Sequence, residues 1–214
     1  MARAAALICT LLTAELLFLV SAVPGLAVLV LLDRDAASLP LIAACALPLG
    51  PALSAVLYTL HHNTGDLTDL HPARAFRQGY RANLRGVLSI WAPILAWLTI
   101  LAVNAAYLRP AGLPGWWLVP LALVAVAATL WGVNALVITS LFAFRVRDVA
   151  RLAAYYLTRT PSVPAGAFGL LAVAVCATAL WSEAVLMLLI PLLVLALLRI
   201  SRPMVADLRA EFTR

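Results

Sequence analysis

Long apolar segments, each of a length that can cross a bilayer, are the feature that most constrains the fold of this chain. A membrane-spanning helix needs about 20 predominantly apolar residues. Apolar residues make up 65% of the chain and charged residues only 11%, with a mean hydropathy of +1.04, whereas soluble domains carry about 25% charged residues. We therefore predict an all-α fold, a polytopic membrane bundle in which residues 1–214 form a single transmembrane domain. The six predicted spans are 4–32, 39–60, 86–108, 116–144, 166–181 and 184–200.

The last two spans come from one apolar block, 165–200, that is too long for a single crossing. As one helix it would be about 54 Å long, against a hydrocarbon core of about 30 Å. Glu183 interrupts the block and is preceded by Trp181 and Ser182, so we predict a tight turn there between two short spans. The alternative is one tilted, kinked helix, which would give five spans and move the C-terminus across the membrane.

The basic residues, all 15 of which are arginines, are distributed unevenly between the connections. With six spans, all but Arg34 and Arg109 fall on one side, in the N-terminus, the connections 61–85 and 145–164, and the C-terminal tail. Cytoplasmic connections carry an excess of basic residues, so both termini are predicted to be cytoplasmic. Five spans would place the arginines of the tail outside, which favours six. The same distribution argues that the net charge of +6 serves membrane orientation, with no nucleic acid as a partner.

The connection 71–85 is predicted to contain a short amphipathic helix that lies in the membrane interface. At 100° per residue, Phe76, Tyr80 and Leu84 form one stripe, and Pro72 suits the first helical turn. Such a helix can bind anionic lipid headgroups or dock on a cytoplasmic partner protein. The opposite face carries the arginines Arg74, Arg77, Arg81 and Arg85.

A second amphipathic segment is predicted at 145–160. Its apolar face would consist of Val146, Val149, Ala153 and Tyr156, while Arg147 and Arg151 lie largely on another face. Pro161 would end it before the fifth span. Together the two basic segments could form a cytoplasmic collar, so Arg147 and Arg151 join the candidate residues for docking a lipid or a partner.

The second span contains a stretch of proline and small residues, followed by an aromatic and basic helix: Pro48, Gly50, Pro51, Ala52 and Ala55, then Phe76, Arg77, Tyr80 and Asn83. These two segments resemble the YesL-like family of bacterial membrane proteins, whose members have no assigned function. It implies a multi-pass protein of the bacterial plasma (inner) membrane. It also implies an accessory role in carbohydrate uptake beside importers of the ATP-binding-cassette (ABC) type, with importer subunits as partners.

An alternative function, a small stand-alone transporter or channel, is suggested by two intramembrane features. Glu15 is the only ionisable residue near the middle of a predicted span, where a charge costs about 2.5–3.5 kcal/mol on insertion scales. Pro48, Gly50 and Pro51 interrupt the second span, and broken helices can offer backbone groups to a substrate. A protonated or snorkelling Glu15 and a simple packing kink are the structural alternatives.

Asn104 and Asn134 are polar amides in the third and fourth predicted spans. Their positions place Asn104 near the outer end and Asn134 deeper, so they are not expected to pair with each other. We predict that each forms a hydrogen bond across a helix interface, of the kind that contributes about 0.6–2 kcal/mol in membranes.

No enzymatic activity, cofactor or metal site is predicted. The chain has no lysine for phosphate binding or Schiff-base chemistry and no catalytic elbow or glycine-rich motif. Cys9, Cys45 and Cys176 are far apart in sequence. The cluster His61, His62 and His71 matches no strong ligand spacing, which leaves a solvated loop as the favoured interpretation.

Overall fold

The protein is described by a computed structural model that covers residues 2–32, 35–62, 71–108, 110–180 and 183–212, which form helices and their connections and contain no strand. The helices, in chain order, are α1 (Ala2–Leu31), η1 (Ala36–Ser38), α2 (Leu39–Cys45), α3 (Leu49–His61), α4 (Pro72–Tyr107), η2 (Gly115–Trp117), α5 (Leu118–Leu141), α6 (Val146–Arg159), α7 (Ser162–Leu180), α8 (Glu183–Ile200) and α9 (Arg202–Phe212).

Five helical segments are long and apolar enough to cross a membrane: Ala5–Gly25, Ala36–His61, Pro72–Tyr107, Gly115–Leu141 and Ser162–Leu180. The pair Val185–Ile200 and Arg202–Glu211, which is bent by 51°, makes a sixth if the two helices are counted as one span. The prediction of an all-α, multi-pass membrane bundle with five or six spans is therefore confirmed.

The apolar block 165–200 is divided between two helices. α7 ends at Leu180 and α8 begins at Glu183, and the two helices pack against each other as a hairpin. Trp181 and Ser182, where the turn was predicted, lie outside the described residues. The structure therefore has two helices in this block, and the alternative of one kinked helix through it is wrong.

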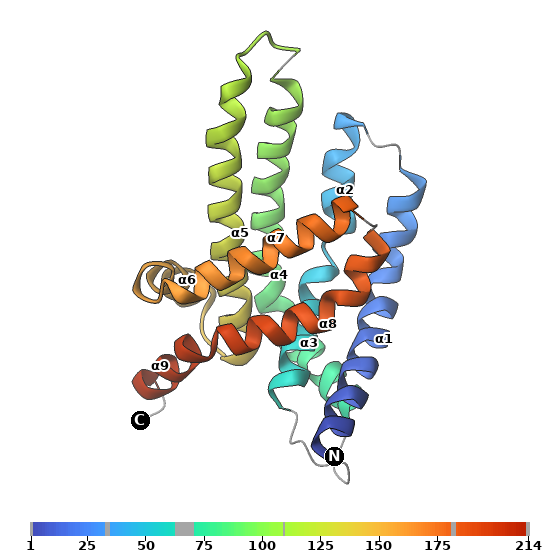
Figure 1. Ribbon diagram of the computed structural model, residues 1–214, viewed down its shortest axis with the longest axis vertical. Helices are drawn as coiled ribbons and strands as arrows, with labels where there is room; N and C mark the ends of the chain where they lie inside the picture. The colour runs from blue at the N-terminus through green and yellow to red at the C-terminus, as the bar shows by residue number, and fades with distance from the viewer. Residues whose placement is uncertain (1, 33–34, 63–70, 109, 181–182, 213–214) are drawn as a thin grey trace.

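The bundle is arranged so that both termini lie at one end (Figure 1). The α1–α2 and α4–α5 connections lie at the opposite end, and α4 and α5 run side by side as a long hairpin (Figure 1). The α7–α8 hairpin crosses this hairpin obliquely; α8 packs on α1 and α3, and α7 packs on α5. The central helix is α3, which contacts α1, α4, α5 and α8.

The predicted basic helix 71–85 is not a separate interfacial element, because α4 continues without a break from Pro72 to Tyr107. Pro72 occupies the first helical turn, as predicted, and no helix-terminating residue separates Arg85 from the span that follows it. A helix of 36 residues is about 54 Å long, so its arginine-containing part extends well beyond a hydrocarbon core of about 30 Å.

The second basic segment does form a short separate helix, α6, as predicted. The chain leaves α5 through Phe142 in an extended conformation (φ −133°, ψ 141°), and Arg145 is also extended (φ −68°, ψ 145°). These extended residues separate α5 from α6. Pro161 follows the end of α6 at Arg159, where the sequence predicts termination.

Candidate functional site

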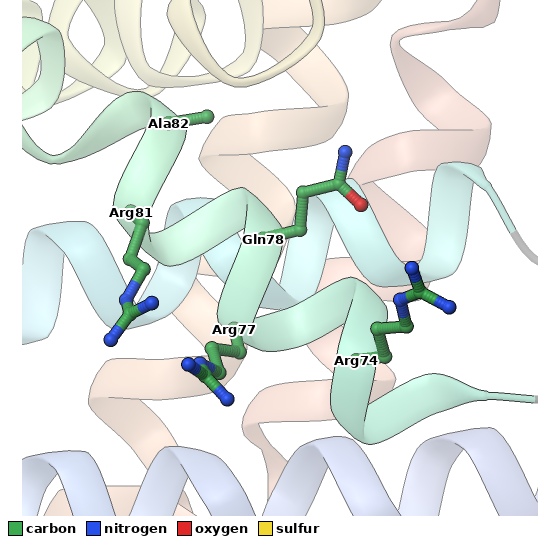
Figure 2. A pocket seen from close by; sticks show the side chains of 5 residues that line it. All are labelled: Arg74, Arg77, Gln78, Arg81 and Ala82. Carbon is green, nitrogen blue, oxygen red and sulfur yellow. The ribbon is translucent and has the colours of Figure 1, made fainter.

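An exposed arginine surface on the N-terminal part of α4 is the most distinctive polar feature of the described chain. Arg74, Arg77, Gln78, Arg81 and Ala82 line an open hollow of about 550 Å³ (Figure 2). The side chains of Arg77 and Arg81 leave successive turns of α4 and point the same way (Figure 2). Arg74 and Arg81 are separated by about 10 Å along the helix axis, so the guanidinium groups can contact an extended anionic ligand.

The arginine surface, defined as Arg74, Arg77, Arg81 and Arg85, which is also exposed, carries positive charge that is not neutralised within the described residues. None of the four arginines forms an ion pair with an acidic side chain in this part of the chain. Guanidinium groups bind carboxylate and phosphate oxygens through parallel hydrogen bonds. The surface is therefore able to bind an external anion.

The opposite face of this segment fixes the arginine surface to the bundle. Phe76 is buried, and Tyr80 is half-buried, with its ring centroid 6.4 Å from that of Phe76. A Cβ atom on Gly79 would lie 2.7 Å from Cβ of Tyr58, so α3 and α4 approach too closely there for a larger residue. The predicted aromatic stripe thus packs on the protein core, and the arginines are held on a rigid helix.

On α6, Arg147 and Arg151 are exposed, as predicted, while Val149, Ala153 and Tyr156 are buried. Val146, predicted to belong to the apolar face, is 39% exposed. The hollow beside α4 is lined by α4 residues alone among those described, so the two α6 arginines do not contribute to it.

The buried face of α6 packs on α5. The indole nitrogen of Trp131 donates a hydrogen bond to the Ala150 carbonyl at 3.1 Å. Burial, reinforced by the carboxylates of Glu211 and Asp207 on α9, raises the pKa of the Tyr156 phenol above its usual value of 10.0. Its hydroxyl has no hydrogen-bond partner among the described residues. Tyr156 is therefore an uncharged packing residue and does not belong to the arginine surface.

The interruption of the second span is located between α2, which ends at Cys45, and α3, which begins at Leu49. The Ala46 carbonyl at this break accepts a hydrogen bond from the indole nitrogen of Trp91 on α4, at 3.0 Å. Gly50 packs on the same indole, because a Cβ atom there would lie 2.5 Å from Trp91 Cγ. Gly50 and Pro51 are buried and Pro48 is half-buried. The geometry matches the packing alternative, since the protein itself uses the backbone acceptor that a substrate would need.

Glu15 lies on α1, half-buried, and well away from this break. Gly25 of α1 packs directly against the Cys45 carbonyl and lies next to Pro48. Glu15 precedes Gly25 by ten residues, a distance of about 15 Å along a helix. Glu15 is at the midpoint of the apolar segment Ala5–Gly25, as predicted, and this position is about 15 Å along α1 from the residue that packs on the break.

The two asparagines differ from their predicted roles. Asn104 is exposed and donates to the Ile100 carbonyl of its own helix at 2.7 Å, so the predicted bond across a helix interface is wrong for it. Asn134 is fully buried, but neither its nitrogen nor its oxygen has a hydrogen-bond partner among the described residues.

A cluster of Ser54, Asn83 and Ser140, which does not include either predicted asparagine, forms hydrogen bonds between three helices. Asn83 donates to Ser54 Oγ at 3.2 Å and to the Ser140 carbonyl at 3.1 Å, and the two serine hydroxyls are 2.9 Å apart. These bonds join α3, α4 and α5. Asn83 was singled out in the sequence only through the family resemblance. The spacing of Asn83 from Phe76, Val87 and Ile90 places all four on one helical face, and this was the sequence signal that Asn83 faces the core.

The histidine cluster gives no metal site in the described part of the chain, where no group of three or more potential ligands converges. Asp66 and Asp69, the acidic residues between His62 and His71, lie outside the described residues. His61 and Arg209 are instead joined by a hydrogen bond at 2.5 Å, which links the end of α3 to α9.

Comparisons of the chain with protein-family models, with characterised proteins and with solved structures find no match. The resemblance to YesL-like proteins therefore remains a prediction from the sequence.

Proposed function

We propose that this protein is a membrane-embedded accessory protein that docks on an anionic partner through the arginine surface of α4. The observation that carries the proposal is the set of four exposed arginines without acidic partners among the described residues, Arg74, Arg77, Arg81 and Arg85. Because one face of the same helical segment is buried against α3, the arginines are presented on a preorganised scaffold. Binding there loses less conformational freedom than binding to a mobile segment.

The proposed partner is a subunit of an ABC-type carbohydrate importer, with which the arginine surface contacts acidic groups at the cytoplasmic face of the membrane. The importer comes from the resemblance to YesL-like proteins, and the side of the membrane comes from the excess of arginines in the connections. Anionic lipid headgroups are expected to contact the same arginines when the partner is absent.

A stand-alone transporter, the alternative function, has less support. It required Glu15 and the break at Pro48 to line one path. Glu15, however, lies about 15 Å along α1 from Gly25, the residue of α1 that packs against the break. The carbonyl at the break is also bonded to Trp91. No observation on the described residues favours transport over docking.

The test is to reverse charge on the arginine surface and to measure which proteins are recovered with this chain from native membranes. Arg77→Glu with Arg81→Glu is expected to reduce recovery of the importer subunits at least about tenfold by quantitative mass spectrometry. The matched control is Arg199→Glu with Arg202→Glu, which changes the net charge equally at two exposed arginines elsewhere. The control is expected to retain the partner.

Two results would contradict the proposal. One is equal loss of partner in both double variants, which would indicate a general effect of net charge. The other is recovery that does not depend on Arg77 and Arg81, while binding of the purified protein to vesicles of anionic phospholipid does depend on them. That combination would make the arginine surface a lipid anchor.

A further inference from the structure

A partly open apolar cavity of about 140 Å³ lies where α3, α4, α5 and α8 meet, separate from the arginine surface. Leu57 of α3, Trp91 and Ile94 of α4, Thr129 of α5, and Val194 and Leu197 of α8 are among the residues that line it. α8 therefore forms one wall of the cavity, and the central helices form the others.

The lining offers no free polar group to a ligand. The Trp91 indole nitrogen is bonded to the Ala46 carbonyl at 3.0 Å. The Thr129 hydroxyl is bonded to the Ala125 carbonyl of its own helix at 2.8 Å. A buried water needs about two to four polar partners, and dry apolar cavities of similar size, about 150 Å³, bind small hydrocarbons such as benzene. The chemistry of the walls thus selects a hydrocarbon and excludes water.

We propose that this cavity binds a short section of one acyl chain of a membrane lipid. The segments that contribute α3, α4 and α5 to its walls are apolar and long enough to span a membrane. Acyl chains are therefore the hydrocarbon present at high concentration around them. α8, which forms one wall of the cavity, also exposes the apolar side chains of Leu188 and Leu192 on its surface. The volume admits a few carbon atoms of a chain and no headgroup.

The test uses the full-length protein in lipid nanodiscs that contain phosphatidylcholine with a photoactivatable diazirine on one acyl chain. After irradiation, labelled residues are identified by mass spectrometry. Labelling is expected on residues of the cavity wall, such as Trp91 and Val194, in addition to lipid-facing residues such as Leu188. Val194→Phe, which fills the cavity, is expected to reduce labelling of Trp91 at least about fivefold.

Leu192→Phe is the matched control, because Leu192 is on the same helix and 53% exposed. It is expected to leave labelling of Trp91 unchanged. Leu197→Phe fills the cavity from a second position and replaces Val194→Phe if that variant is not monodisperse on gel filtration. The proposal is overturned if lipid-facing residues are labelled but the cavity wall is not. It is equally overturned if labelling of Trp91 persists in a folded, cavity-filled variant.

Discussion

Trp91 and Ala46 are joined by a hydrogen bond of 3.0 Å across the break in the second span, from the indole nitrogen to the backbone carbonyl. The same carbonyl also accepts the Leu49 N–H at 3.2 Å, so the indole is its second donor. The bond attaches α4 to the segment between α2 and α3, and Gly50 gives the indole room to approach. The break is thus a defined packing joint between α3 and α4.

Trp91→Phe removes the indole donor but keeps an aromatic ring at the joint. We expect a loss of about 1 kcal/mol in the free energy of unfolding, because the hydrogen bond that joins α4 to the break is lost, although the Ala46 carbonyl keeps the Leu49 N–H as a donor. Chemical unfolding in detergent measures this loss. Trp97→Phe is the control, since Trp97 is 51% exposed, and it is expected to unfold like the parent protein. Equal stability of all three proteins would contradict the role of Trp91.

Gly25→Ala tests the close packing of α1 against the end of α2. The new Cβ atom would collide with the Cys45 backbone carbonyl, which cannot move like a side chain. We expect a loss of about 1–3 kcal/mol, as for overpacking of a core. Gly169→Ala is the matched control, because nothing lies within 4 Å of a Cβ there. Alanine should stabilise that helix by up to about 1 kcal/mol. The two substitutions should therefore shift the thermal unfolding midpoint in opposite directions, and shifts of the same sign would contradict this packing.

The sequence predicts some elements of the fold, such as the spans and α6, but not the continuity of α4. The long apolar runs predict the spans because bilayer thickness alone sets their length. The extended chain before Arg145 and Pro161 after α6 isolate that helix locally. The continuity of α4 through Arg85 and Gly86 has no such local signal. The packing of its N-terminal part on α3, where Gly79 meets Tyr58, is a contact that the sequence does not reveal.

In the candidate site, too, features set by local spacing were predicted, while contacts between helices were not. The spacing of the arginines predicts their shared exposed face, and the structure has all four exposed. The interhelical bonds of Asn83 could not be assigned from its position alone, because its partners Ser54 and Ser140 come from other helices. The predicted interhelical bond of Asn104 is wrong because an exposed amide can form its hydrogen bond within its own helix, here with the Ile100 carbonyl.

The cluster of Ser54, Asn83 and Ser140 is expected to act as one unit. Ser54→Ala and Asn83→Ala each remove part of it, and the double variant should lose less stability than the sum of the two. The expected coupling is about 0.5–2 kcal/mol, in the range measured between contacting groups in membrane proteins and elsewhere. A double-mutant cycle on unfolding free energies gives the value. Strict additivity would mean that the bond of 3.2 Å between the two side chains contributes nothing.

Tyr156→Phe is expected to raise the free energy of unfolding by about 1 kcal/mol near pH 7, because it removes a buried hydroxyl without a partner among the described residues. The pKa of the Tyr156 phenol is raised by burial and by the carboxylates of Glu211 and Asp207. Stability linked to the neutral phenol is thus present below about pH 10 and declines as the pH rises through and beyond that value.

Unfolding measured from pH 8 to 11 should therefore show a shallower alkaline decline for Tyr156→Phe than for the parent protein. Tyr155→Phe serves as the comparison, because Tyr155 is 45% exposed. An identical alkaline decline in the parent and in Tyr156→Phe would contradict the assigned burial of the phenol.

We propose that the arginine surface faces the cytoplasm while the α4–α5 connection lies on the other side of the membrane. The most direct measurement is labelling of single cysteines with a membrane-impermeant maleimide, after replacement of Cys9, Cys45 and Cys176. In intact cells, Ala111→Cys is predicted to react and Gln78→Cys is predicted to stay unlabelled. In inverted membrane vesicles the pattern should reverse. Labelling of both positions from the same side would contradict the account.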